Sequence, residues 1–179
     1  MKPDDDQTAS PQQRPLYLWA FPLGHMAVDW GGGAIYLLAP AVATDLGLST
    51  AQVGLLFTGM MLGPGLVALP VGLFGDTFRF RRILLLSTFW WVAIAYLLAS
   101  LTTQYWLLVV MVAIATAGAM AWHPLAMGDL VQRMPERKAF AMAIHGIGGT
   151  LAQVLAPPSV GFLLALLSWQ RVLQVSTLP

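Results

Sequence analysis

The chain has 179 residues, of which 58% are hydrophobic and only 9% are charged, and its formal net charge is +1. Soluble domains carry roughly a quarter charged residues, so the charge here is too low for a solvated surface around a core. The near-neutral net charge gives no basis for nucleic-acid binding, and the absence of cysteine excludes disulfides and thiolate chemistry. The composition therefore predicts an integral membrane protein whose main surroundings are the lipid bilayer.

The first segment, 1–15, is polar, with Asp4, Asp5 and Asp6 followed by glutamine, serine and proline. We expect it to form a disordered cytoplasmic tail. A cleavable signal peptide needs a basic stretch that leads directly into a short apolar run and a small-residue cleavage site. The first apolar block starts too late and is too long for that, so it is predicted to be a retained membrane span.

Five apolar segments follow, and each is close to or above the length of about 20 residues that crosses a bilayer. Ser49 or Thr50, in the first outer connection, is expected to cap the helix that follows it. Short connections make neighbouring helices antiparallel, so the expected fold is an all-α polytopic bundle over residues 16–171. The remaining residues, 172–179, are too few for another crossing and are expected to begin a missing sixth helix, so that the bundle is truncated before it. The predicted spans are about 17–43, 51–74, 83–101, 105–127 and 139–167.

Basic residues between the spans indicate the orientation. If the spans alternate in direction, eight of the nine lysines and arginines fall on one side, and only Arg171 falls on the other. The positive-inside rule then places the amino terminus and both basic loops in the cytoplasm, and the protein in the plasma (inner) membrane. A missed or invented span would scatter these charges over both sides. The eight are Lys2, Arg14, Arg79, Arg81, Arg82, Arg133, Arg137 and Lys138.

The first span carries an ionisable pair. His25 and Asp29 are four residues apart and share one helical face, which Gly32, Gly33 and Tyr36 extend. Asp29 lies roughly 18 Å along the helix, near the bilayer centre, where an ionised carboxylate costs at least about 2.5 kcal/mol. Two interpretations stay open. The pair either binds protons or substrate at a central cavity, or it locks this helix to its neighbours.

Two further histidines lie in predicted spans. His123 precedes a proline near the inner end of the fourth span, and His145 lies near the inner end of the fifth. His145, Gly149 and Gln153 share a helical face that either lines a pathway or allows close packing. For each histidine a functional and a structural role stay equally open. Because the three histidines lack clustered ligand spacing, no metal site is expected, and no motif predicts a cofactor or a catalytic residue.

The connection after the second span combines a glycine, an acidic residue and clustered arginines, namely Gly72, Asp76, Arg81 and Arg82. It resembles the signature loop of the major facilitator superfamily, Gly-x-x-x-Asp-Arg-x-Gly-Arg-Arg/Lys, and departs from it at two positions. In that family the acidic residue joins a charge network that steadies the cytoplasm-closed gate. The resemblance implies this role for Asp76 and a gating function for the loop.

Three further segments combine polar and helix-breaking residues, and these are Gly24-His25 with Asp29, Trp122-His123-Pro124, and Pro135-Glu136-Arg137 leading to His145-Gly146-Ile147-Gly148-Gly149. Together they resemble the fosmidomycin-resistance group of drug-efflux transporters within the superfamily. The fourth span contains no arginine, whereas many proton antiporters of the superfamily carry one there.

The resemblance implies two six-helix halves built from inverted three-helix repeats, with substrate bound between the halves near the midplane. The chain is then the amino-terminal half, partnered by a missing carboxy-terminal half or a second copy, and it exports a small molecule by alternating access driven by the proton gradient. The alternative is a non-transporting membrane partner. An enzyme is not expected. The predicted substrate and proton pathway comprises His25, Asp29, Tyr36, His123, His145 and Gln153.

Overall fold

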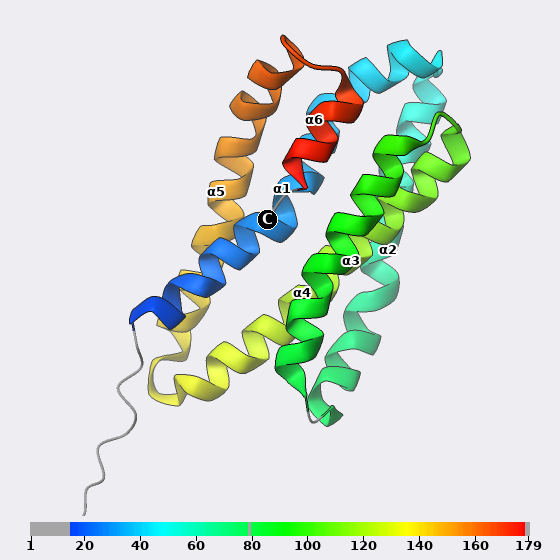
Figure 1. The fold of residues 1–179 in the computed structure, drawn as a ribbon. Helices are drawn as coiled ribbons and strands as arrows, with labels where there is room; N and C mark the ends of the chain where they lie inside the picture. The colour runs from blue at the N-terminus through cyan, green and yellow to red at the C-terminus, as the bar shows by residue number, and fades with distance from the viewer. Residues whose placement is uncertain (1–14, 79, 178–179) are drawn as a thin grey trace, which may run out of the picture.

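The computed structural model describes residues 15–78 and 80–177, and within these ranges it consists of helices and short connections without a strand. Five long helices run up and down, and a short sixth helix packs among them (Figure 1). The predicted all-α bundle is confirmed. The elements are α1 Pro15–Leu46, α2 Thr50–Thr77, α3 Arg81–Leu101, α4 Tyr105–Arg133, the 3-10 turn η1 Pro135–Arg137, α5 Lys138–Leu164 and α6 Trp169–Ser176.

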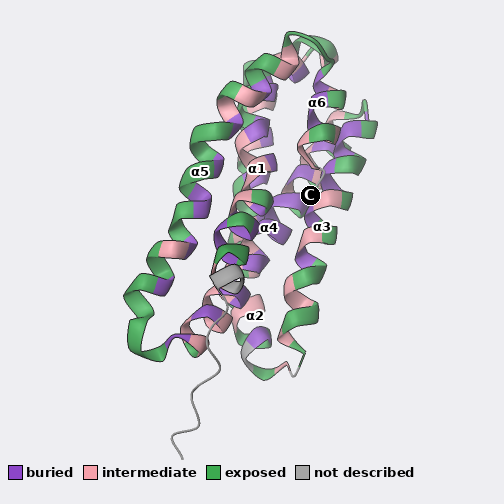
Figure 2. Cartoon of the chain, turned by 60° about the vertical axis from the view of Figure 1, so that its left-hand side comes forward, coloured by how far each residue is buried: buried purple, intermediate pink, exposed green. Residues whose placement is uncertain are grey.

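Helices α1 to α5 are each long and apolar enough to cross a membrane. Their outer faces are green in Figure 2, which marks exposed residues, while the buried residues face inward. Leu66 is 73% exposed and Trp90 is 70% exposed, and many other large apolar side chains share this position. Contiguous apolar surface of this kind is suited to lipid rather than to water. The protein is a multi-pass membrane protein, as predicted.

Several helices continue beyond the apolar segments from which the spans were predicted. Helix α2 runs on to Thr77 and α4 to Arg133, each past the apolar block of its span. Hydropathy detects the part of a helix that lies in hydrocarbon, whereas the backbone hydrogen bonds continue through the polar residues that follow.

The helices form two groups that meet at the centre. One group pairs α1 with α5 along most of their lengths, and the other places α4 between α2 and α3 (Figure 1). Helices α1 and α4 join the groups, and α6 packs against α1 and α3. On α1, Gly24 leaves room for the indole ring of Trp122, and Gly31 leaves room for the phenol ring of Tyr96. Both rings are buried, so small residues on α1 set how closely the two groups approach.

Helices α2 and α4 approach closely because α2 carries glycines where they touch. A Cβ atom at Gly63 would collide with the carbonyl oxygen of Ala113. The hydroxyl of Thr116 on α4 donates a hydrogen bond of 2.9 Å to the carbonyl oxygen of Met60 on α2. Small residues and interhelical hydrogen bonds are what hold membrane helices together, since lipid offers no hydrophobic driving force between them.

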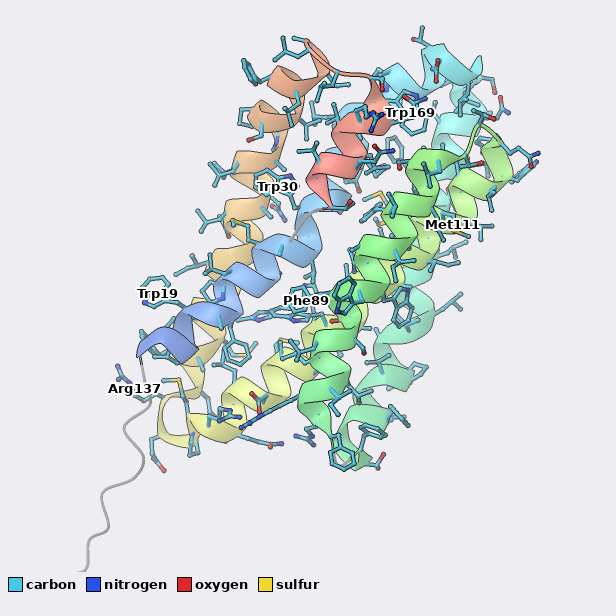
Figure 3. The ribbon with its side chains drawn as sticks, in the orientation of Figure 1. Trp19, Trp30, Phe89, Met111, Arg137 and Trp169 are labelled. Atoms are coloured by element: carbon cyan, nitrogen blue, oxygen red, sulfur yellow. The ribbon has the colours of Figure 1, made fainter. Side chains whose placement is uncertain are left out.

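The end of the bundle where α1 is followed by α2 is ordered by caps. Ser49 caps α2 through a reciprocal pair of hydrogen bonds with Gln52, which confirms the predicted cap. Gly47, with φ of 63°, turns the chain between α1 and α2 in a conformation that favours glycine. The indole Nε1 of Trp169, at the start of α6 (Figure 3), donates a 2.8 Å hydrogen bond to Asp45 in the same turn. This bond fixes the start of α6 against the end of α1.

Candidate functional site

All three histidines of the chain meet between α1, α4 and α5. The ring of His25 lies 4.3 Å from that of His145 and 4.6 Å from that of His123, measured between centroids. One nitrogen from each ring lies within 4.8 Å of the others. This spatial cluster was not predicted, because the histidines show no ligand spacing along the sequence. Spacing along a sequence detects clusters within one helix, whereas this cluster forms only when three helices pack.

Asp29 completes the cluster. Its Oδ2 atom lies 3.1 Å from Nε2 of His25, and its Oδ1 atom lies 3.7 Å from Nε2 of His123. The contact with His25 confirms that the two residues share a face of α1. The carboxylate keeps 28% of its side chain exposed. It therefore has an imidazole on each of two helices and also an open side.

Two backbone carbonyls fix the orientation of the imidazoles. Nδ1 of His25 donates a 2.7 Å hydrogen bond to the carbonyl oxygen of His145, and Nδ1 of His123 donates one of 2.8 Å to that of Ala119. A carbonyl oxygen only accepts, so both Nδ1 atoms carry hydrogen. In the neutral rings, both Nε2 atoms then present lone pairs, and they face each other at 3.0 Å. A cation among these atoms is needed to relieve the repulsion.

A glycine pair on α5 lets this helix approach His25. A Cβ atom at Gly149 would lie 2.7 Å from Nε2 of His25, and one at Gly148 would collide with the carbonyl oxygen of Pro22. The same approach stacks His145 on the ring of Trp122, with 5.3 Å between centroids and 12° between planes. His145 is buried, and its Nδ1 has no hydrogen-bond partner among the described residues.

An open cavity of about 430 Å³ adjoins the cluster. Four of the six predicted pathway residues line it, and these are Asp29, Tyr36, His123 and Gln153. His25 and His145 are buried behind this wall and do not line the cavity. Gln153 and His145 were predicted to share one face of α5. In the structure Gln153 lines the cavity, whereas the small residues of that face pack against α1.

Sequence reasoning missed Tyr96 on α3. Its side chain is fully buried, its ring packs against Gly31, and it contributes to the cavity wall beside α1. No described residue forms a hydrogen bond with its hydroxyl. A tyrosine in the middle of an apolar span was the available signal, because its hydroxyl is costly to bury in lipid. Met60 and Met120 also line the cavity, and their apolar side chains carried no signal.

The predicted gating loop lies where the end of α2 and the start of α3 meet α4. Nε of Arg81 donates a 2.8 Å hydrogen bond to the carbonyl oxygen of Gly75, which ties the start of α3 to the end of α2. Gly72 faces Pro124 on α4, and Arg82 is exposed. The side chain of Asp76 lies outside the described residues, so its role in a charge network stays a prediction.

Together these features define a multi-pass helical membrane protein in which buried ionisable side chains border an open cavity, which is how secondary transporters are built. Comparison with known proteins gives the family. The chain belongs to the Major Facilitator Superfamily, whose family profile matches residues 23–178. The chain is also 25% identical over 167 residues to the uncharacterized MFS-type transporter YwoD of Bacillus subtilis (strain 168). That match covers 93% of this chain and 37% of the relative, so the chain spans well under half of the relative's length.

Proposed function

We propose that this chain forms the amino-terminal half of a secondary transporter that exports a small molecule by alternating access, driven by the proton gradient. One observation carries the proposal, namely that the carboxylate of Asp29 sits between two imidazoles on the wall of a cavity of about 430 Å³. Ionisable side chains at membrane depth are costly and mark substrate or ion pathways. His25, His123 and His145 position this charge, and Tyr36 and Gln153 contact the substrate.

The cavity wall indicates the kind of substrate. Methionine, proline and aromatic side chains make up much of it, and Met60, Met120 and Pro157 are examples. Asp29 is its one charged residue, and no lysine or arginine lines it within the described part of the chain. Flexible methionines adapt to ligands of different shapes. These features suit an amphipathic molecule that is neutral or positively charged.

The amino terminus and the two basic loops face the cytoplasm in this proposal, and the protein resides in the inner membrane. The one-sided distribution of lysine and arginine supports this orientation. In the gating loop, Gly72, Asp76, Arg81 and Arg82 would steady the cytoplasm-closed state against the other half.

The open side of the cavity needs a cover during transport. A carboxy-terminal half, or a second copy of this chain, would provide the opposite wall, because superfamily substrates bind between two six-helix halves. In the alternative function the chain associates with a membrane partner through its glycine faces and transports nothing. Exposed glycines with nothing within 4 Å of an added Cβ, such as Gly54, Gly65 and Gly161, support this alternative.

Transport by the complete protein in proteoliposomes tests the proposal. Cationic amphipathic dyes should leave the protein's cytoplasmic side against their gradient when a pH gradient is imposed, and nigericin should abolish this movement. Active transport that persists after the pH gradient has collapsed would remove the proton from the mechanism. A stably inserted protein that moves no compound under any gradient would favour the non-transporting alternative.

A further inference from the structure

Three lone-pair donors converge at one point of the cluster. The Nε2 atoms of His25 and His123 are 3.0 Å apart; Oδ2 of Asp29 lies 3.1 Å from Nε2 of His25, and Oδ1 of Asp29 lies 3.7 Å from Nε2 of His123. The carbonyls that hold both Nδ1–H groups leave these Nε2 atoms directed toward the shared point. The arrangement is therefore an acceptor triangle that needs a positive charge at its centre.

The dimensions of the triangle match one face of a metal coordination sphere. Ligand atoms at about 2.0–2.1 Å from an ion such as Zn²⁺, with angles between 90° and 109°, lie roughly 2.8–3.4 Å apart. The Nε2–Nε2 distance and the distance from His25 Nε2 to Oδ2 of Asp29 fall in this range, and the distance from His123 Nε2 to the other oxygen, Oδ1, is longer. Metal-ligating histidines almost always donate their other ring N–H to a carbonyl or carboxylate. His25 and His123 both do so.

His145 is the fourth side chain beside the proposed ligands His25, Asp29 and His123. His145 is 96% buried, and its Nδ1 atom has no partner among the described residues. Its ring lies close enough for one nitrogen to be within 4.8 Å of the other two histidine ligand atoms. A proton could occupy only one edge of the triangle at a time, whereas a metal ion accepts lone pairs from every member together.

We propose that His25, Asp29 and His123 bind a divalent late first-row transition-metal ion such as Zn²⁺ or Co²⁺, with His145 as a further ligand. Imidazole and carboxylate together suit these ions, and two histidines with one carboxylate leave coordination positions open. Asp29 and His123 line the cavity, so an ion held by them lies beside it. The site therefore holds its ion where a molecule in the cavity can reach it.

Direct metal binding to the purified protein tests this. The chain contains only three histidines and no cysteine, so background binding is low when the affinity tag is free of histidine. Isothermal titration in detergent should show one Zn²⁺ bound per chain. Co²⁺ should add visible absorption bands whose intensity reports the coordination geometry. This assay requires no transport, so it distinguishes failure of the metal site from failure of the proposed transport function.

Variants assign the ligands. His123→Gln and Asp29→Asn should each weaken Zn²⁺ binding by more than tenfold, since loss of even an outer-sphere partner costs about 10–100-fold. His145→Gln should alter the Co²⁺ spectrum. Asp129→Asn is the matched control, because it removes a carboxylate on α4 that pairs with Arg133 away from the cluster. Helical content and elution volume confirm that each variant is folded.

Two results would overturn the proposal. The first is wild-type protein that binds neither Zn²⁺ nor Co²⁺ at micromolar concentration. The second is binding that survives unchanged in folded His123→Gln and Asp29→Asn protein. Either result would leave the proton as the cation that this triangle holds.

Discussion

At the scale of single residues, two carbonyl groups determine what the central histidines can do. The carbonyls of His145 and Ala119 commit one nitrogen of each imidazole, so the remaining nitrogens can only receive a cation or share a proton. The carboxylate of Asp29 adds negative charge at the same point. The chemistry of the cluster thus arises from backbone atoms of α4 and α5 as much as from the three side chains.

Replacing Asp29 should uncouple transport. Asp29→Asn keeps the shape of the side chain and removes the charge on the cavity wall. Driven efflux by the complete protein should fall to the rate of passive exchange, because a carboxamide cannot take up and release the coupling proton. Passive exchange of substrate should persist. Proteoliposome assays with and without a pH gradient measure both rates. Normal driven efflux in a folded Asp29→Asn protein would leave the pair with a packing role.

The glycine pair on α5 gives a second prediction. Gly149→Ala places a methyl group 2.7 Å from Nε2 of His25, so the ring or the helix must move. Overpacking of this kind typically costs about 1–3 kcal/mol, and the displaced ring should also lower transport. Gly146→Ala is the control on the same helix, because nothing lies within 4 Å of its new methyl group. Thermal unfolding in detergent should separate the two variants. Equal stability would mean that α5 adjusts freely.

At the scale of helices, the contact between α2 and α4 depends on one missing side chain. Gly63 faces the backbone of Ala113, which cannot rotate away as a side chain can. Around this contact, Thr116 bonds to the carbonyl of Met60, and Tyr105 donates a 2.9 Å hydrogen bond to the carbonyl of Gln52. The two helices are therefore joined by hydrogen bonds at Gln52 and at Met60, and the close approach at Gly63 lies next to the second of these.

Gly63 and Gly65, which are two residues apart on α2, should respond differently to replacement by alanine. Gly63→Ala should destabilise the protein by about 1–3 kcal/mol or more, because its methyl group meets backbone. Gly65→Ala should be neutral or slightly stabilising, since the space around it is open and alanine is the better helix former. Detergent unfolding of both variants checks this. If Gly63→Ala were as stable as Gly65→Ala, close α2–α4 packing would not hold in the membrane.

At the scale of the whole molecule, the helix count and the charge distribution predict one membrane topology, in which the spans alternate in direction. Single cysteines at Thr103 and Glu136, both exposed, should react with an impermeant thiol reagent from opposite sides of the membrane. The chain has no cysteine of its own, so each label reports one position. Inside-out and right-side-out vesicles supply the two sides. Labelling of both positions from the same side would contradict the alternation of the spans.

Features that depend on patterns within one helix were predicted from the sequence, and features that depend on contacts between helices were not. The five spans and the cap at Ser49 depend on local patterns, and both were predicted. The contact between His25 and Asp29 follows from helical periodicity within α1. The histidine cluster and the place of Tyr96 depend on how the helices rotate and pack, and no pattern within a single helix carries that information. Tyr36, which was predicted to line the pathway, lines the cavity. The burial of His145 behind the cavity wall was not predicted.

The histidine cluster also constrains how the protein is made. His25 and His123 are 98 residues apart, and His25 and the carbonyl of His145 are 120 apart. Synthesis adds roughly 5–20 residues per second, so Asp29 waits about 5–20 s for the histidine of α4 and longer for α5. Throughout this time α1 carries an ionisable side chain whose partners on other helices have not yet been translated. An ionised carboxylate is costly in hydrocarbon, so we expect α1 to stay beside water or the insertion machinery until α4 and α5 arrive.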